Sequence, residues 1–182
     1  MTADIGFTTG TGASATTTWS TYLFSSLGRG GKGVFALDVT NPSSLTQPNA
    51  ATIFKWSFTD ADMGYNISDP LVHPQSGQAS PIAKMNNGKF AWLVPNGVKS
   101  PTGKASINVL YADGPNAAGS WAGRYNVLDT SSSAGAPTGT ANSSGMVGAT
   151  WVDLDGNGTA DAVYGTDIDG RLWKFDVTDT NP

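Results

Sequence analysis

The sequence predicts an all-β protein folded as a partial β-propeller, an open arc of about three blades, and three observations support this fold class. Short stretches rich in β-branched and aromatic residues alternate with Gly, Pro, Asn and Asp along the chain. No segment has the apolar period of three to four residues that marks an amphipathic helix. A strand motif that ends in Asp recurs.

Ten stretches qualify as strands, most of them bounded by turn residues. They are Trp19–Leu27, Gly33–Val39, Thr52–Phe58, Ser80–Met85, Phe90–Val94, Ser106–Asp113, Arg124–Leu128, Val147–Asp153, Asp161–Thr166 and Arg171–Val177. Residues 1–18 are small and polar. We therefore expect a flexible N-terminal segment at residues 1–18 and the partial propeller at residues 19–182.

The repeat supports a propeller over other all-β folds. Its apolar strands end in Asp38, Asp113 and Asp176, which are 75 and 63 residues apart. Four strands per repeat at this spacing are typical of propeller blades with long loops. The chain would then hold the last three strands of one blade, one whole blade and the first three strands of another. A self-contained sandwich of ten strands is the alternative.

Composition excludes several classes of protein. Lys and Arg number 10 against 14 Asp and Glu, a net charge of −4, and this acidic balance argues against a nucleic-acid partner. The absence of Cys rules out disulfides and thiolate metal sites. No apolar run is long enough to span a membrane, and the first residues do not resemble a signal peptide.

The strongest chemical signal is the stretch DLDGNGTAD at residues 153–161, which has the spacing of a compact calcium loop. Tyr164 stands where an EF-hand has its closing Glu, so the loop would have to close through Asp161. Ca²⁺ is favoured because every ligand is a hard oxygen and the nearby carboxylates repel one another without a cation. The expected ligands are Asp153, Asp155, Asn157, Thr159 through its carbonyl, and Asp161. An Asp- and Gly-rich turn without an ion is the alternative.

Other candidate sites are weaker. Asp167 and Asp169 could be a second pair of ion ligands, although a simple turn is the better interpretation. His73 is the single histidine, and no motif places a nucleophile beside it. We therefore expect that the protein is not an enzyme. Two other classes remain open: a quinoprotein dehydrogenase, whose blades have similar strand endings, and a carbohydrate-binding module that uses exposed tryptophans.

The chain resembles the propeller of the PilC/PilY type IV pilus tip adhesins over about residues 19–177. The stretches that carry the resemblance are Trp19–Phe24, Gly30–Pro42, Met63–Pro70, Met85–Trp92 and, most specifically, Val152–Asp176. The resemblance implies an exported, larger protein at the pilus tip or cell surface that promotes pilus assembly, surface attachment and twitching motility. It also implies that calcium in the 153–161 loop tunes pilus extension and retraction.

The same resemblance suggests the partners. They would be the remaining blades of a parent protein, minor pilin components of the pilus, and a host or abiotic surface receptor that the sequence does not identify. No nucleic acid is expected among them.

Overall fold

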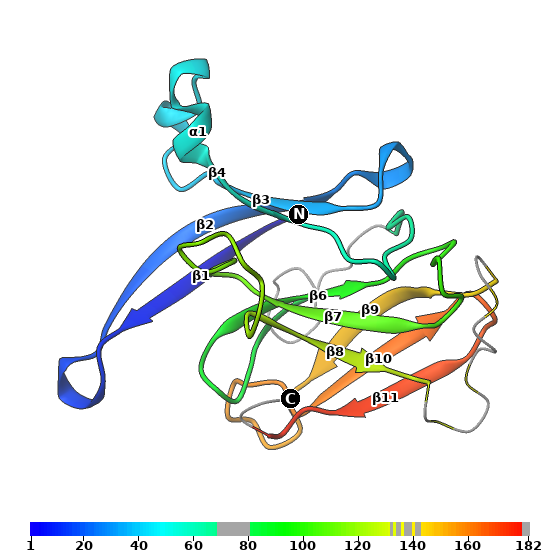
Figure 1. Ribbon diagram of the computed structural model, residues 1–182. Helices are drawn as coiled ribbons and strands as arrows, with labels where there is room; N and C mark the ends of the chain where they lie inside the picture. Colours follow the sequence, from blue (N-terminus) through cyan, green and yellow to red (C-terminus); the bar gives the residue numbers. More distant parts are fainter. Residues whose placement is uncertain (69–80, 132, 134–135, 137–139, 141–142, 180–182) are drawn as a thin grey trace.

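The structure is a computed structural model that describes residues 1–68, 81–131, 133, 136, 140 and 143–179. Within these residues the strands form three antiparallel sheets, and each sheet follows the chain order (Figure 1). The first sheet contains β1 (Thr2–Thr9), β2 (Thr16–Ser26), β3 (Val34–Asp38) and β4 (Phe54–Phe58). The second contains β5 (Ile82–Lys84), β6 (Phe90–Pro95), β7 (Ser106–Tyr111) and β8 (Tyr125–Asp129). The third contains β9 (Met146–Val152), β10 (Ala162–Asp167) and β11 (Leu172–Asp176).

Short helical turns lie only in the connections among the described residues. They are η1 (Gly12–Ser14), η2 (Gly28–Gly30), η3 (Pro42–Ser44), η4 (Gln47–Asn49) and α1 (Ala50–Ile53). No helix in this part of the chain has the length and apolar character needed to cross a membrane.

The second sheet is the centre of the fold, because it packs against the other two sheets through its two faces. Trp92 and Leu110 belong to the core that it shares with the first sheet. Leu93 and Val109 belong to the core that it shares with the third sheet. Successive residues of a strand point to opposite faces, so β6 and β7 need nearly continuous apolar runs to fill both cores. Their sequences, FAWLVP and SINVLY, largely meet that need.

Three tryptophans join neighbouring sheets through hydrogen bonds as well as packing. The indole nitrogen of Trp56 donates to the carbonyl oxygen of Ala112 at 3.0 Å, and that of Trp121 donates to Ser57 at 3.1 Å. Between the second and third sheets, the Trp151 indole donates to Ile82 at 2.8 Å. Aromatic rings thus fill the space between sheets while their polar edges satisfy backbone groups there.

The N-terminal residues differ from the prediction. Residues 1–18 were expected to form a separate flexible segment, but β1 pairs with β2 from Thr2 opposite Leu23 to Thr9 opposite Thr16. Ala3 and Ile5 are buried in the first core, which explains why this strand docks. The first sheet therefore has four strands where three were predicted, and the expected boundary at residue 19 falls inside β2.

The other ten strands lie where the sequence predicted them, with ends that differ by a few residues. The third sheet has three strands in the described part of the chain, as expected for an incomplete blade. The N-terminal residue of the predicted strand Ser80–Met85 lies outside the described residues.

Candidate metal centre

The predicted calcium loop connects β9 to β10 in the third sheet, on the lower side of the molecule in Figure 1. One carboxylate oxygen from each of Asp153, Asp155 and Asp161 lies within 4.8 Å of the others. Gly156 and Gly158 have φ angles of +80° and +84°, a conformation that costs glycine little and that folds the loop back on itself. The chain thus brings three acidic side chains together within nine residues.

The two ends of the loop have different surroundings. Leu154, Asp155 and the residues up to Gly158 are exposed, whereas Ala160 and Asp161 are buried. The Asp161 carboxylate accepts hydrogen bonds from the backbone amides of Leu154 at 2.6 Å and Asp155 at 3.3 Å. The buried Asp161 carboxylate therefore fixes the exposed end of the loop through the backbone amides of Leu154 and Asp155.

Backbone amides also surround Asp153. Its carboxylate accepts hydrogen bonds from Gly158 at 2.8 Å, Gly156 at 2.7 Å and Asn157 at 3.2 Å. The hydrogen bond from Gly158, helped by the other two and opposed by desolvation, lowers the pKa of Asp153 below its ordinary value. The loop therefore favours the ionised carboxylate, which is the form that binds a cation.

Asn157 and Thr159 complete the predicted ligand set. The Asn157 amide donates to Asp155 at 3.0 Å, and its side-chain oxygen accepts from the Thr159 backbone amide at 2.7 Å. The Thr159 hydroxyl also lies 2.9 Å from the side-chain oxygen of Asn86, to which it donates. No local sequence pattern could have linked Asn86 to a loop more than 70 residues away.

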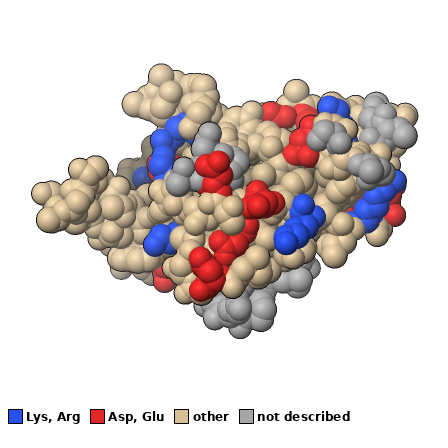
Figure 2. Space-filling model, turned by 90° about the horizontal axis from the view of Figure 1, so that it is seen from below, with Lys and Arg blue, Asp and Glu red and all other residues tan. Residues whose placement is uncertain are grey.

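The donor set fits a hard cation such as Ca²⁺. It consists of carboxylate, amide and carbonyl oxygens, with no sulfur or imidazole among the five predicted ligands. Figure 2 views the molecule from below and shows acidic side chains gathered in a band on this face, with the basic ones mostly apart from them. Such a field raises the local concentration of cations.

The second predicted pair, Asp167 and Asp169, is already neutralised by protein groups. Asp167 accepts hydrogen bonds from the indole of Trp173 at 2.9 Å and from the backbone amide of Arg171 at 2.8 Å. The guanidinium of Arg171 contacts both carboxylates, at 3.3 Å and 2.5 Å. Burial raises the pKa of Asp167, but these hydrogen bonds outweigh it and leave the pKa below its ordinary value. The pair stabilises the turn between β10 and β11, which favours the simpler interpretation.

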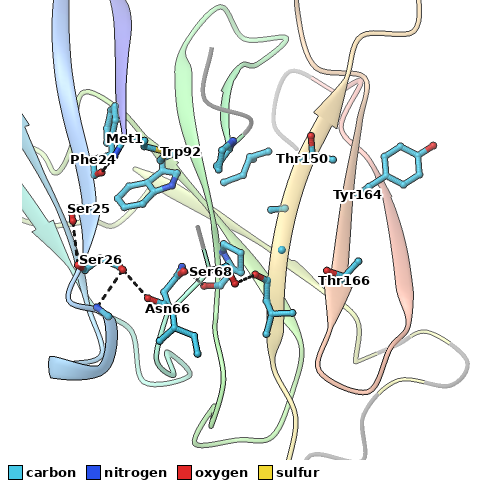
Figure 3. Close-up of a pocket in the computed structure, with 18 of the residues that line it drawn as sticks. Met1, Phe24, Ser25, Ser26, Asn66, Ser68, Trp92, Thr150, Tyr164 and Thr166 are labelled. Carbon is cyan, nitrogen blue, oxygen red and sulfur yellow. Dashed lines mark hydrogen bonds between the residues drawn. The ribbon is translucent and has the colours of Figure 1, made fainter. Parts of the chain in front are cut away.

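A cavity of about 720 Å³ lies where the three sheets meet, lined by parts of β2, β6, β9 and β10 (Figure 3). Ser26 donates a hydrogen bond to the carbonyl oxygen of Asn66 at 2.7 Å, and Ser68 donates to the carbonyl of Val147. The described lining includes Arg29 but no carboxylate side chain and no histidine. His73 lies outside the described residues.

Tryptophan exposure bears on the carbohydrate-binding alternative. All six tryptophans lie in the described residues, and among them Trp19 alone is largely exposed, at 59%. Its ring contacts Phe90 with centroids 5.9 Å apart. Most of the tryptophans thus have a structural position between sheets.

Three meander sheets that pack face to face around a shared cavity define part of a β-propeller. Residues 6–182 match the family described as the PilY1 beta-propeller domain, and the chain belongs to that family. The predictions of a partial propeller and of the pilus family are therefore confirmed, and the ten-stranded sandwich is not.

The relatives support the same assignment. A "Type IV pilus biogenesis factor PilY1 homolog" of Xylella fastidiosa is 30% identical over 164 residues, which are 90% of this chain and 10% of that protein. A second homolog from that organism is 32% identical over 161 residues, 88% of this chain and 11% of the relative. The "Type IV pilus biogenesis factor PilY1" of Pseudomonas aeruginosa PAO1 is 30% identical over 162 residues, 87% of this chain and 11% of the relative.

A solved structure matches the arrangement of the sheets. The crystal structure of the P. aeruginosa PilY1 C-terminal domain superposes with a TM-score of 0.64 at 27% identity, and the match covers 96% of this chain and 29% of that chain. The present chain spans about a tenth of the length of the curated relatives that it matches. It is thus similar to one part of a larger propeller domain.

Proposed function

We propose that the chain is a calcium-binding propeller segment of a type IV pilus biogenesis and adhesion protein. Family membership and the names of the relatives support a role in pilus biogenesis. In that role the parent protein acts at the cell surface or pilus tip, in pilus assembly, surface attachment and twitching motility. Its partners are the remaining blades, minor pilin components and a surface receptor, and the chain itself catalyses no reaction.

One observation carries the calcium proposal: the clustering of the Asp153, Asp155 and Asp161 carboxylates in one loop. A bound cation would offset the repulsion among these acids and tie the exposed end of the loop to its buried end. Asn157 would add its side-chain oxygen and Thr159 its carbonyl. The amides around Asp153 already hold that carboxylate in its ionised form.

Calcium is expected to bind the 182-residue chain and to raise its melting temperature. Extracellular calcium modules bind with a Kd of about 10⁻⁴–10⁻³ M. A ligand at 100 times its Kd adds about 2.7 kcal/mol to the free energy of unfolding. Isothermal titration calorimetry gives the affinity, and melts with and without CaCl₂ give the stabilisation. No heat and no shift of the melt at millimolar Ca²⁺ would overturn the proposal.

Asp155→Ala is expected to abolish both the heat and the melting shift, because it removes a charged ligand. Asp129→Ala is the matched control. Asp129 is also exposed and accepts hydrogen bonds from the residue two positions on, as Asp155 does. An Asp129→Ala variant that loses calcium binding equally would show that the effect is general to acidic residues and not a property of this loop.

The calcium affinity is also expected to depend on pH in one direction. Protons compete with the cation for carboxylates whose ordinary pKa is near 3.9. Because the pKa of Asp153 is lowered, this group stays ionised at all pH values above its ordinary range and protonates only below it. Affinity measured by calorimetry should therefore stay constant between about pH 7 and pH 5 and fall below about pH 4. An affinity that stays constant well below the ordinary Asp pKa of about 3.9 would contradict carboxylate ligation.

A further inference from the structure

The β5–β6 turn of the second sheet packs directly against the metal loop of the third sheet. The side-chain amide of Asn86 donates to the carbonyl oxygens of Ala160 at 2.8 Å and Val177 at 3.2 Å. Its side-chain oxygen accepts from the Thr159 hydroxyl at 2.9 Å. The backbone amide of Ala160 also donates to the carbonyl of Lys84 at 2.8 Å. The half-buried Asn86 side chain is thus hydrogen-bonded to two successive loop residues, Thr159 and Ala160, and to Val177, the residue that follows β11.

The place of these contacts in the loop is informative. Thr159 and Ala160 stand immediately before the buried ligand Asp161, and Thr159 supplies the predicted carbonyl ligand. Asn86 therefore anchors the C-terminal end of the loop to another sheet. Among the described residues, the exposed end from Leu154 to Gly158 makes no such hydrogen bond to another sheet, and it contacts Asp161 only through backbone amides.

Other groups close the turn that carries Asn86. The backbone amide of Met85 donates to Lys89, that of Gly88 donates to Met85, and the Asn87 side chain accepts from the Lys89 amide at 3.0 Å. Gly88 supplies the positive φ, at +78°. Among the described residues, the Asn86 side chain forms its hydrogen bonds with the third sheet and its loop, so its role lies in that contact.

We propose that Asn86 is a positioning residue for the metal loop and that it couples cation binding to the contact between the second and third sheets. This inference rests on the proposed calcium function. A cation bound by Asp161 and the Thr159 carbonyl would restrict the motion of the segment to which Asn86 is hydrogen-bonded. Through these hydrogen bonds it would also restrict the motion of the β5–β6 turn. Conversely, loss of Asn86 lets Thr159 move away from its ligand position.

Calorimetry on the full 182-residue chain with CaCl₂ tests the proposal. Asn86→Ala should weaken calcium binding about 10-fold or more, the size of effect typical when a group that orients a ligand is removed. Asn87→Ala is the matched control, since it changes the same residue type in the same turn. Asn87 contacts Tyr111 and Lys89 instead of the loop, so this variant should keep its affinity within about twofold of the original.

Hydrogen exchange on the unchanged chain provides a second measurement that needs no variant. Calcium should slow exchange at the amides of Ala160, Met85 and Gly88, and should leave the distant amide of Ser44 unchanged. The same CaCl₂ titration separates the two hypotheses. If the unchanged chain does not bind calcium, both fail. If it binds but Asn86→Ala has the original Kd, or if Met85 and Gly88 gain no protection, only the role of Asn86 is overturned.

Discussion

Replacing Trp56 with alanine is expected to lower the free energy of unfolding by about 3–5 kcal/mol, the usual cost of deleting a buried aromatic ring. Trp56 is 3% exposed and lies between the first and second sheets. Its ring lies 6.0 Å from that of Phe24, 6.3 Å from Trp92 and 5.3 Å from Trp121. A domain with a total stability of about 5–15 kcal/mol would lose much of it. Urea unfolding followed by far-ultraviolet circular dichroism measures the change.

Two variants separate packing from hydrogen bonding at this position. Trp56→Phe keeps an aromatic ring but leaves the Ala112 carbonyl without its indole donor, which should cost about 1–3 kcal/mol. Trp19→Ala is the control for size, because Trp19 is 59% exposed and contacts Phe90 at the surface. It should cost less than about 1.5 kcal/mol. Equal losses for Trp56→Ala and Trp19→Ala would contradict the assigned role of Trp56 between the sheets.

The strands were predictable because their signals are local. Val34-Phe-Ala-Leu-Asp38 and Leu172-Trp-Lys-Phe-Asp176 are short apolar stretches between turn residues, and both form strands. The acidic residues of the 153–161 loop were predictable for the same reason, since their spacing alone brings them together. β1 was not recognised because Ala3 and Ile5 give a weak alternation beside a long run of Thr and Gly.

Contacts between sheets could not be derived from local patterns. The hydrogen bond from Asn86 to Ala160 joins residues 74 positions apart, and that from Trp121 to Ser57 joins residues 64 apart. Such pairs depend on how the blades pack against one another, and this packing cannot be predicted from a short stretch of sequence. The resemblance to a known family supplied the overall arrangement instead, and the fit to the PilY1 C-terminal domain agrees with it.

The isolated chain is expected to self-associate through the open edge of its third sheet. β11 is the outer strand of that sheet, and no strand of the described residues pairs with its other side. Leu172 on this edge is 69% exposed. Unpaired strand edges with exposed apolar side chains favour pairing between molecules, which the exposed charged side chains of Lys174 and Asp176 on the same strand oppose.

The structure also refines which residue should drive the association. Trp173 on β11 is half-buried and its indole donates to Asp167, so the exposed Leu172 is the better candidate on this strand. Sedimentation velocity between about 5 and 200 μM should show dimers or larger species that grow with concentration, because association obeys mass action.

Leu172→Lys should shift this association to several-fold higher concentration, because a lysine on an edge strand opposes pairing. Leu45→Lys is the matched control, since Leu45 is also exposed, at 48%, but lies in the connection between β3 and β4. If both variants reduce association equally, net charge and not the β11 edge is responsible. A chain that stays a cooperative monomer across the whole range would mean that the open edge is protected without a neighbouring blade.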